Sequence, residues 1–488
     1  MNPPAPSTPP LPAPHGAPPV VLIEALATAD AAGPVVSPGA LLLRFDHPRI
    51  PHAATLLAAG TPAEVASHPL AAAARRVRLP RSVLIPGLVN AHTHLDLTHI
   101  GPLPHDPSDG GPGFVGWVDV IRTRRATEEA AIAESVRLGI GLSLAAGVVA
   151  VGDIAGAPNG RPSLVPWRTL RESPLLGVSF LEFFAIGRSE TPRLESLGAI
   201  LAEAAAEPGG PGSTEPDVAR FGVQPHAPNT VGLLAYRWAA ERAREMGLRL
   251  ATHLAETIEE RRFIGEAAGP QRELLERVGI WDDALLADIG RGRHPVEHVA
   301  EVLAVHPFAA AHVNDATDEA IEILARTGTT VAYCPRASTY FGASARFGPH
   351  RYRDMLSAGV RVALGTDSVV NLHPWATDGR TVERLGPLDE MRLLHQRDAT
   401  DPRTLLGMAT TAGAAALGLE ADRFTFAAPP RDRPRPIAGV VAIDLPEGRP
   451  ERGEDPLAAA LRTAGHPSLL SREIFCTLTR QDGPGQHS

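Results

Sequence analysis

Apolar runs of strand length recur along the middle of the chain and alternate with stretches of helical periodicity. The apolar runs occupy residues 83–95, 148–156, 176–187, 221–228, 248–256, 309–315, 329–338 and 360–368. Helical spacing of apolar residues follows at 127–146, 231–246, several stretches up to about 305, 317–327, 350–358, 387–396 and 402–418. Continuous apolar strands that alternate with helices are typical of buried parallel strands in βα units. Eight such units over roughly 330 residues predict an α/β fold, a (β/α)₈ barrel of the TIM type.

A doubly wound open sheet is the alternative architecture for such an alternating pattern. That fold carries a glycine-rich phosphate loop after its first strand. Here Asn90-Ala-His-Thr-His occupies this place, so the barrel is favoured.

The two ends of the chain have a different pattern from the middle. Short apolar segments such as VVLIEAL and ALLLRF follow residue 20, and GVVAIDL lies at 439–445, so we expect both ends to pair in a small β-domain. The predicted divisions are a disordered proline-rich tail (1–19), an N-terminal part of the small domain (20–82), the barrel (83–420), and a C-terminal part with a tail (421–488). No element is assigned to 446–488.

Composition narrows the class of protein. Apolar residues make up 44% of the 488, enough for a full-sized core, and the net charge of −9 is spread without a basic stripe. Nucleic-acid and membrane partners are therefore not expected, and no apolar run is long enough to cross a bilayer. The N-terminus lacks a secretion-signal pattern, and only Cys334 and Cys476 occur, which favours the cytoplasm.

The sequence contains no lysine. This excludes a Schiff-base lysine, a phosphate-loop lysine and a pyridoxal-phosphate anchor. It also excludes a carbamylated lysine that would bridge two metal ions.

His92 and His94 are separated by one residue in an apolar strand. Residues i and i+2 of a strand point to the same side, so both imidazoles can face one point at the barrel mouth. Imidazole nitrogens suit zinc and Fe(II). Two histidines that form only local hydrogen bonds are the structural alternative.

Further polar residues stand at the ends of other apolar strands: His253 with Glu256 three residues on, His312 and Asp367. A carboxylate after an apolar run is costly unless it is paired or ligated. Each residue alone could cap the next helix. Together they favour an active site at the C-terminal face of the barrel, where TIM-type enzymes have theirs.

These motifs resemble a known family. Asn90-Ala-His-Thr-His-Leu, His253-Leu-Ala-Glu256-Thr and Leu364-Gly-Thr-Asp-Ser368 are similar to the amidohydrolase superfamily, in particular its cyclic-deaminase and chlorohydrolase branch. That branch includes guanine, cytosine, methylthioadenosine/S-adenosylhomocysteine and aminodeoxyfutalosine deaminases. The resemblance covers about residues 20 to 420.

The resemblance implies one divalent metal ion, zinc before Fe(II), bound by His92, His94, His253 and Asp367. The absence of lysine agrees with a mononuclear site. Glu256 would be the proton shuttle, and His312 and Asp367 would hold the metal-activated water against the substrate.

Two further motifs imply substrate contacts. Val223-Gln-Pro-His226-Ala-Pro resembles the fourth-strand motif, whose histidine contacts substrate, and Tyr333-Cys-Pro-Arg336-Ala-Ser resembles the seventh-strand motif. We expect His226, Arg336 and Ser368 to contact the substrate. Many relatives have Ser-Asn after the seventh-strand proline, so Arg336 could grip a substrate carboxylate. It could equally pair with a helix carboxylate.

The implied function is metal-dependent hydrolysis of a non-peptide C–N bond in a small molecule. Deamination of an aminated purine nucleoside is the leading hypothesis, and aminodeoxyfutalosine is the first candidate because of the Cys-Pro-Arg and Tyr-Phe-Gly segments. The alternatives are an amidase or chlorohydrolase acting on another heterocycle, and a catalytically inactive metal-binding barrel. The sequence does not fix the oligomeric state; a homodimer is compatible with it.

Overall fold

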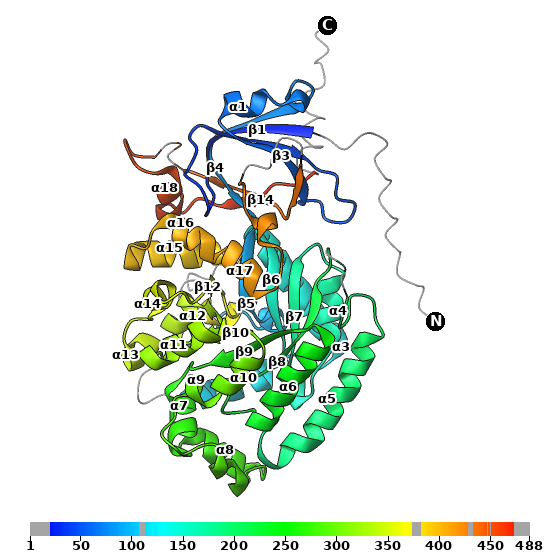
Figure 1. The fold of residues 1–488 in the computed structure, drawn as a ribbon, viewed down its shortest axis with the longest axis vertical. Helices are drawn as coiled ribbons and strands as arrows, with labels where there is room; N and C mark the ends of the chain where they lie inside the picture. The colour runs from blue at the N-terminus through cyan, green and yellow to red at the C-terminus, as the bar shows by residue number, and fades with distance from the viewer. Residues whose placement is uncertain are drawn as a thin grey trace.

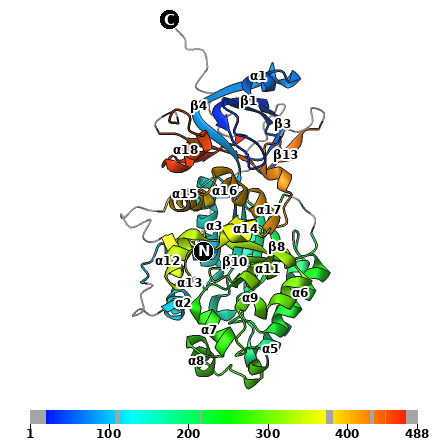
Figure 2. The same cartoon turned by 60° about the vertical axis from the view of Figure 1, so that its left-hand side comes forward.

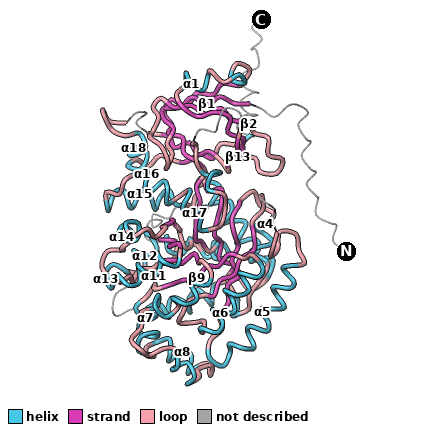
Figure 3. Tube along the Cα trace, in the orientation of Figure 1, coloured by secondary structure: helices cyan, strands magenta, loops and turns pink. Residues whose placement is uncertain are grey.

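The fold is a barrel with a separate sheet at one end (Figure 1). It is known from a computed structural model that describes residues 20–106, 113–213, 215, 217–372, 382–427, 433–446, 448 and 450–472. The proline-rich segment 1–19, predicted to be disordered, lies outside the described residues. Figure 3 shows the barrel strands at the centre of a ring of helices.

Eight parallel strands form the barrel, as predicted. In order around the sheet they are β5 (Leu88–Thr93), β6 (Val148–Ala155), β7 (Leu176–Phe183), β8 (Arg220–Pro225), β9 (Arg249–Leu254), β10 (Phe308–His312), β11 (Thr330–Tyr333) and β12 (Val362–Leu364). The first and last strands meet just beyond β12, where the Asp367 N–H donates to the His92 carbonyl at 3.1 Å and the His94 N–H donates to the Asp367 carbonyl at 2.8 Å. The closure therefore brings three of the predicted metal ligands together.

Helices surround the barrel. They are α2 (Gly113–Arg124), α3 (Glu129–Ala145), α4 (Val165–Arg171), α5 (Glu190–Ala205), α6 (Leu233–Met246), α7 (Ile258–Glu266), α8 (Pro270–Arg277), α9 (Pro295–His298), α10 (Ala300–Val305), α11 (Asp318–Thr327), α12 (Pro335–Tyr340), α13 (Ala343–Phe347), α14 (Tyr352–Ser357), α15 (Pro387–Asp398), α16 (Pro402–Met408) and α17 (Thr411–Ala416). The sequence analysis did not identify α2, α4, α5 or α13. α5 buries only Leu197, Leu201 and Ala204, which leaves a weak apolar stripe.

The predicted strands extend past the ends of the observed ones, and two of them show the physical reason. The predicted strand 329–338 ends at Tyr333, and α12 begins at Pro335, because proline lacks an N–H and suits the first helical turn. The predicted strand 83–95 is divided between two sheets at Gly87. A Cβ atom on Gly87 would lie 2.6 Å from the Val149 side chain, so the crossing point requires glycine.

Segments from both ends of the chain build the second sheet, as expected for the small β-domain. Its order is β13 (Arg435–Ile437), β3 (Ala54–Gly60), β2 (Gly39–Arg44), β1 (Val20–Thr28), β4 (Arg75–Pro86), β14 (Val440–Asp444) and β15 (Pro467–Leu469). α1 (Pro62–Ala66) packs on β2 and β3, and α18 (Pro456–Arg462) contacts α15 and α16 beside the barrel (Figure 2). β15 and α18 lie in the stretch that the sequence analysis left unassigned.

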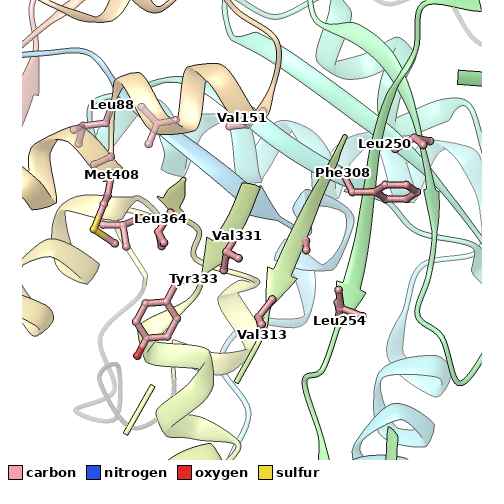
Figure 4. Packing of buried hydrophobic residues seen from close by; sticks show 14 of the residues in the cluster. Leu88, Val151, Leu250, Leu254, Phe308, Val313, Val331, Tyr333, Leu364 and Met408 are labelled. Carbon is pink, nitrogen blue, oxygen red and sulfur yellow. The ribbon is translucent and has the colours of Figure 1, made fainter. Parts of the chain in front are cut away.

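The core lies between the barrel and its helices. Figure 4 shows Val331 of β11, Leu364 of β12 and Met408 of α16 in this layer. Alternate residues of the same strands, among them Ala332 and Ala363, belong to a second cluster of buried apolar side chains. This alternation fills the barrel interior, so the site is confined to the strand ends. Within the described residues, we find no helix with the length and apolar character to traverse a bilayer.

Candidate active site

Four histidines and one aspartate converge at the carboxyl ends of the barrel strands. His92 and His94 stand at the end of β5, His253 in β9, His312 at the end of β10, and Asp367 just after β12. All five are buried. The ring centres of His92 and the other three histidines are 5.0 to 5.3 Å apart. The structure thus brings together residues that are up to 275 positions apart in the sequence.

The distances between donor atoms fit one small ion. His94 Nε2 lies 3.4 Å from both His253 Nε2 and Asp367 Oδ1, and His92 Nε2 lies 3.9 Å from Asp367 Oδ1. Tetrahedral ligands about 2.0–2.2 Å from a metal lie about 3.3–3.6 Å from one another. His92 Nε2 is buried and has no hydrogen-bond partner among the residues that the structure describes. The residues present therefore fit a divalent ion.

The protonation states also suit metal binding. His253 Nδ1 lies 3.1 Å from the His226 carbonyl, which can only accept, and 3.2 Å from the Gln224 amide nitrogen, which can only donate. The tautomer with its hydrogen on Nδ1 bonds the carbonyl and leaves the lone pair on Nε2, which faces His94. Burial lowers the pKa of His253 to about 3 and the pKa values of His92 and His94 well below their ordinary value. Neutral imidazoles are the form that binds metal.

Asp367 is held in a strained conformation by a chain of polar side chains. Its φ is +60°, in the left-handed region that residues other than glycine rarely adopt. The Asn371 amide donates to Asp367 Oδ2 at 2.8 Å, and the Ser368 hydroxyl donates to Asn371 at 2.8 Å. Asp367 Oδ1 is left facing the histidines. Burial raises the pKa of Asp367 to about 7.

Glu256 faces His312 across the same mouth. Its Oε1 lies 3.5 Å from His312 Nε2, and burial followed by the nearby Asp367 charge raises the pKa of Glu256 well above its ordinary value. A carboxyl group with a raised pKa binds a proton more readily than an ordinary glutamate, so Glu256 is suited to accept a proton and pass it on.

Neighbouring side chains position the turn that carries Glu256. Ala255 has a φ of +50°, and the Glu260 carboxylate accepts the N–H groups of Ala255 and Glu256 at 2.9 and 2.8 Å. On the other side, the Asn314 amide donates to the Glu256 carbonyl at 3.2 Å. Both sides of the Glu256 peptide are therefore held by hydrogen bonds from other elements.

A cavity of about 670 Å³ opens over these residues. His94, His253, Glu256, His312 and Asp367 border one end of it, together with His226. His226 Nδ1 lies 2.7 Å from the Thr230 hydroxyl oxygen, and that hydroxyl donates its hydrogen to the Ala227 carbonyl. His226 Nδ1 is thus the donor, which leaves Nε2 as a hydrogen-bond acceptor for a ligand.

The structure does not bring the other two predicted substrate contacts to the cavity. Arg336 is buried, and its guanidinium binds Glu390 of α15 with Nε to Oε1 at 2.5 Å, so the helix-carboxylate alternative describes its contacts. The Ser368 hydroxyl is used in the chain that holds Asp367. Neither residue is among the described residues that border the cavity. Both predictions of substrate contact are corrected.

The sequence analysis missed several residues of the site. Glu182 borders the cavity from β7, and Arg125 borders it just beyond α2. Asn371 supports the site by donating a hydrogen bond to Asp367, and Glu260 supports it by accepting one from the Glu256 backbone N–H. Glu182 could have been found from the sequence, because it is a charged residue in an otherwise apolar strand. No pattern in the sequence pointed to Arg125.

Comparisons with known proteins agree with this geometry. Residues 83–424 match the model of the amidohydrolase family. An aminodeoxyfutalosine deaminase of Deinococcus radiodurans is 28% identical over 397 residues, which cover 75% of this chain and 79% of the relative.

Two solved structures share the fold over nearly their full length. The Helicobacter pylori aminofutalosine deaminase in complex with methylthio-coformycin superimposes with a TM-score of 0.68 at 18% identity, covering 92% of this chain and 98% of that one. A Xanthomonas campestris adenosine deaminase with bound zinc has a TM-score of 0.64 at 18% identity, covering 95% and 98%.

Proposed function

This chain belongs to the amidohydrolase family and is a hydrolytic enzyme, and we propose that it releases ammonia from an aminated purine nucleoside. One observation carries the proposal: His92, His94 and His253 form one cluster of possible metal ligands, and His92, His312 and Asp367 form a second cluster that shares His92. Glu256 lies beside them, and, His92 apart, these residues border a cavity. A binding-only metal site has no need of a proton-transfer group, whereas hydrolysis does.

We infer that His92, His94, His253 and Asp367 hold one divalent metal ion. The nitrogen-rich donor set suits zinc and is compatible with Fe(II). The zinc in the Xanthomonas campestris structure supports zinc as the first choice. When bound, such an ion supplies a water molecule that ionises near pH 7.

The chain's own residues then direct the water and its protons. Asp367 Oδ1 lies 3.4 Å from His94 Nε2, and His312 Nε2 lies 3.5 Å from Glu256 Oε1; from these positions both would orient the attacking water toward the ring carbon. Glu256 takes a proton from this water and delivers it to the adjacent ring nitrogen. The remaining proton of the same water then passes to the amino group, the C–N bond breaks, and ammonia leaves. The product carries oxygen in place of the amino group.

The named relatives indicate the substrate class. The Deinococcus radiodurans and Helicobacter pylori proteins support aminodeoxyfutalosine as the first substrate to test, with adenosine derivatives next. We assign His226 Nε2 to the substrate, because it is an acceptor that borders the cavity.

An ammonia-release assay with metal-loaded protein tests this function. The panel is adenosine, methylthioadenosine, S-adenosylhomocysteine, guanine and aminodeoxyfutalosine. Glu256→Gln is expected to abolish turnover while metal content stays near one ion per chain. No ammonia from any member would refute the deaminase proposal, and chloride release from a chlorinated triazine would then favour the chlorohydrolase alternative.

We also propose that the enzyme works as a small-molecule catalyst in the cytoplasm, as the two-cysteine composition suggests. A homodimer is compatible with the sequence, and light scattering of the purified full chain would measure the oligomeric state.

A further inference from the structure

A buried carboxylate in the cavity wall has few partners. Glu182, near the end of β7, is 2% exposed, yet its nearest polar contacts are the Gln224 amide at 3.4 Å and the Arg125 guanidinium at 3.8 Å. Among the described residues, no hydrogen bond to Glu182 shorter than 3.4 Å is found. A carboxylate offers about four acceptor positions, and burying it without close partners costs several kcal/mol. The site therefore has acceptor capacity left for a ligand.

The cationic neighbour of Glu182 is held in place and is also incompletely bonded. The Arg125 side chain is 13% exposed and lies between Glu182 and Asp96, with its Nε 3.4 Å from Asp96 Oδ2. This Nε has no hydrogen-bond partner within the described structure. A Cβ atom on Gly156 would lie 2.5 Å from the guanidinium carbon, so the backbone there is shaped to receive Arg125. Both side chains border the cavity.

A second metal ion is the competing explanation for Glu182. Ligand atoms of Glu182, His226 and His253 lie within 4.8 Å of one another. However, His253 Nδ1 already has two hydrogen-bond partners, the His226 carbonyl at 3.1 Å and the Gln224 amide at 3.2 Å, and His253 Nε2 lies 3.4 Å from His94 Nε2, in the first cluster. Only Glu182 and His226 are left, which is too few protein ligands for a typical metal site.

We propose that Glu182 and Arg125 form a substrate-recognition pair, in which the Glu182 carboxylate accepts an N–H or O–H donor of the substrate and the Arg125 guanidinium donates to an acceptor beside it. The inference rests on the proposed function. Since His226 Nε2 is also an acceptor on this side, the substrate edge facing β7 and β8 must be rich in donors. A sugar hydroxyl and a heterocycle N–H share this chemistry.

Steady-state kinetics of Glu182→Gln with paired substrates tests the recognition pair. Gln keeps the shape and removes one acceptor, so kcat/KM for the best nucleoside is expected to fall about tenfold or more, with the loss mainly in KM. For an analogue that lacks the recognised donor, wild type and Glu182→Gln are expected to behave alike. The 2′-deoxy and 3′-deoxy nucleosides and the free base serve as analogues and identify whether the donor is on the sugar or on the ring.

Three controls make the outcome decisive. Glu203→Gln makes the same chemical change on the exposed face of α5 and is expected to leave kinetics unchanged. Arg125→Gln is expected to reproduce the KM effect. Metal content near one ion per chain is expected in every variant, and a second ion that is lost in Glu182→Gln would overturn the proposal.

Failure of this inference is separable from failure of the proposed function. If Glu182→Gln has wild-type kcat/KM with every substrate, the pair does not recognise the substrate, although deamination stands. If wild type releases no ammonia, binding of the same nucleosides is measured by calorimetry. Equal binding by wild type and Glu182→Gln would then refute the pair independently, and at least tenfold weaker binding by the variant would support it.

Discussion

Replacing Arg336 by Met separates the two roles considered for this residue. Arg336 and Glu390 are both buried; Arg336 Nε lies 2.5 Å from Glu390 Oε1, and the Arg336 backbone N–H donates to Oε2 at 3.0 Å. Methionine fills similar space without charge, so Glu390 would lose its main cation. Breaking a buried ion pair from one side costs about 3–5 kcal/mol. We expect the free energy of unfolding to fall by about this amount at pH 8.

The sign of the pH dependence follows from Glu390. Burial raises the pKa of this carboxyl, and the Arg336 charge opposes that rise, so removing Arg336 raises the pKa further. At pH values between the pKa of Glu390 in the unfolded chain and its higher pKa in the folded variant, the folded state binds more protons than the unfolded state. The penalty of the variant is therefore largest above the raised folded pKa and shrinks as the pH falls toward the unfolded value of about 4.5.

Urea unfolding at pH 5.5 and pH 8, with KM measured at pH 8, checks this prediction. KM is expected to stay within about threefold, or about 0.7 kcal/mol, because Arg336 does not border the cavity. Adding Glu390→Gln should restore most of the stability, since the carboxylate that lost its cation is then removed. Arg137→Met, which breaks an exposed ion pair, should cost less than about 1 kcal/mol. Normal stability with a tenfold higher KM would contradict the assignment and show that Arg336 contacts the substrate.

Further changes probe the metal site, the proton shuttle and the barrel. Removing metal with a chelator should abolish ammonia release and lower the melting temperature, and zinc should restore both. Bound zinc should stabilise the folded state by about 4 kcal/mol when the free zinc concentration is about a thousand times its dissociation constant. Asn371→Ala removes a 2.8 Å hydrogen bond to Asp367 and should weaken metal affinity about 10–100-fold by competition titration. Glu260→Ala leaves two N–H groups of the Glu256 turn without their acceptor; kcat should fall about 10–100-fold with metal content unchanged, and unchanged kcat would show that the turn holds itself. Gly177→Ala should destabilise the fold by about 3 kcal/mol or more in urea unfolding, because φ is +123° and a Cβ atom would lie 1.9 Å from a backbone oxygen.

The sequence predicted an element well where the pattern of apolar residues lies entirely within that element. The period of apolar residues identified all eight barrel strands, because a buried parallel strand is apolar on both faces. The predicted strands extended across Gly87 and Pro335, because the apolar run continues there although the chain changes sheet at Gly87 and enters a helix at Pro335. The period of apolar residues also missed α5, whose buried stripe is only three residues.

By itself, the sequence determined the fold class and the residues that could bind metal, because strand periodicity and the His92-x-His94 spacing are local properties of the chain. Only the tertiary structure decided which groups meet. It paired Arg336 with Glu390 across two elements, assigned Ser368 to the support of Asp367 through Asn371, and brought Arg125 to Glu182. The physical reason is that a side chain's partner depends on which elements the closed barrel places beside it, and that information is not contained in any one segment of the chain.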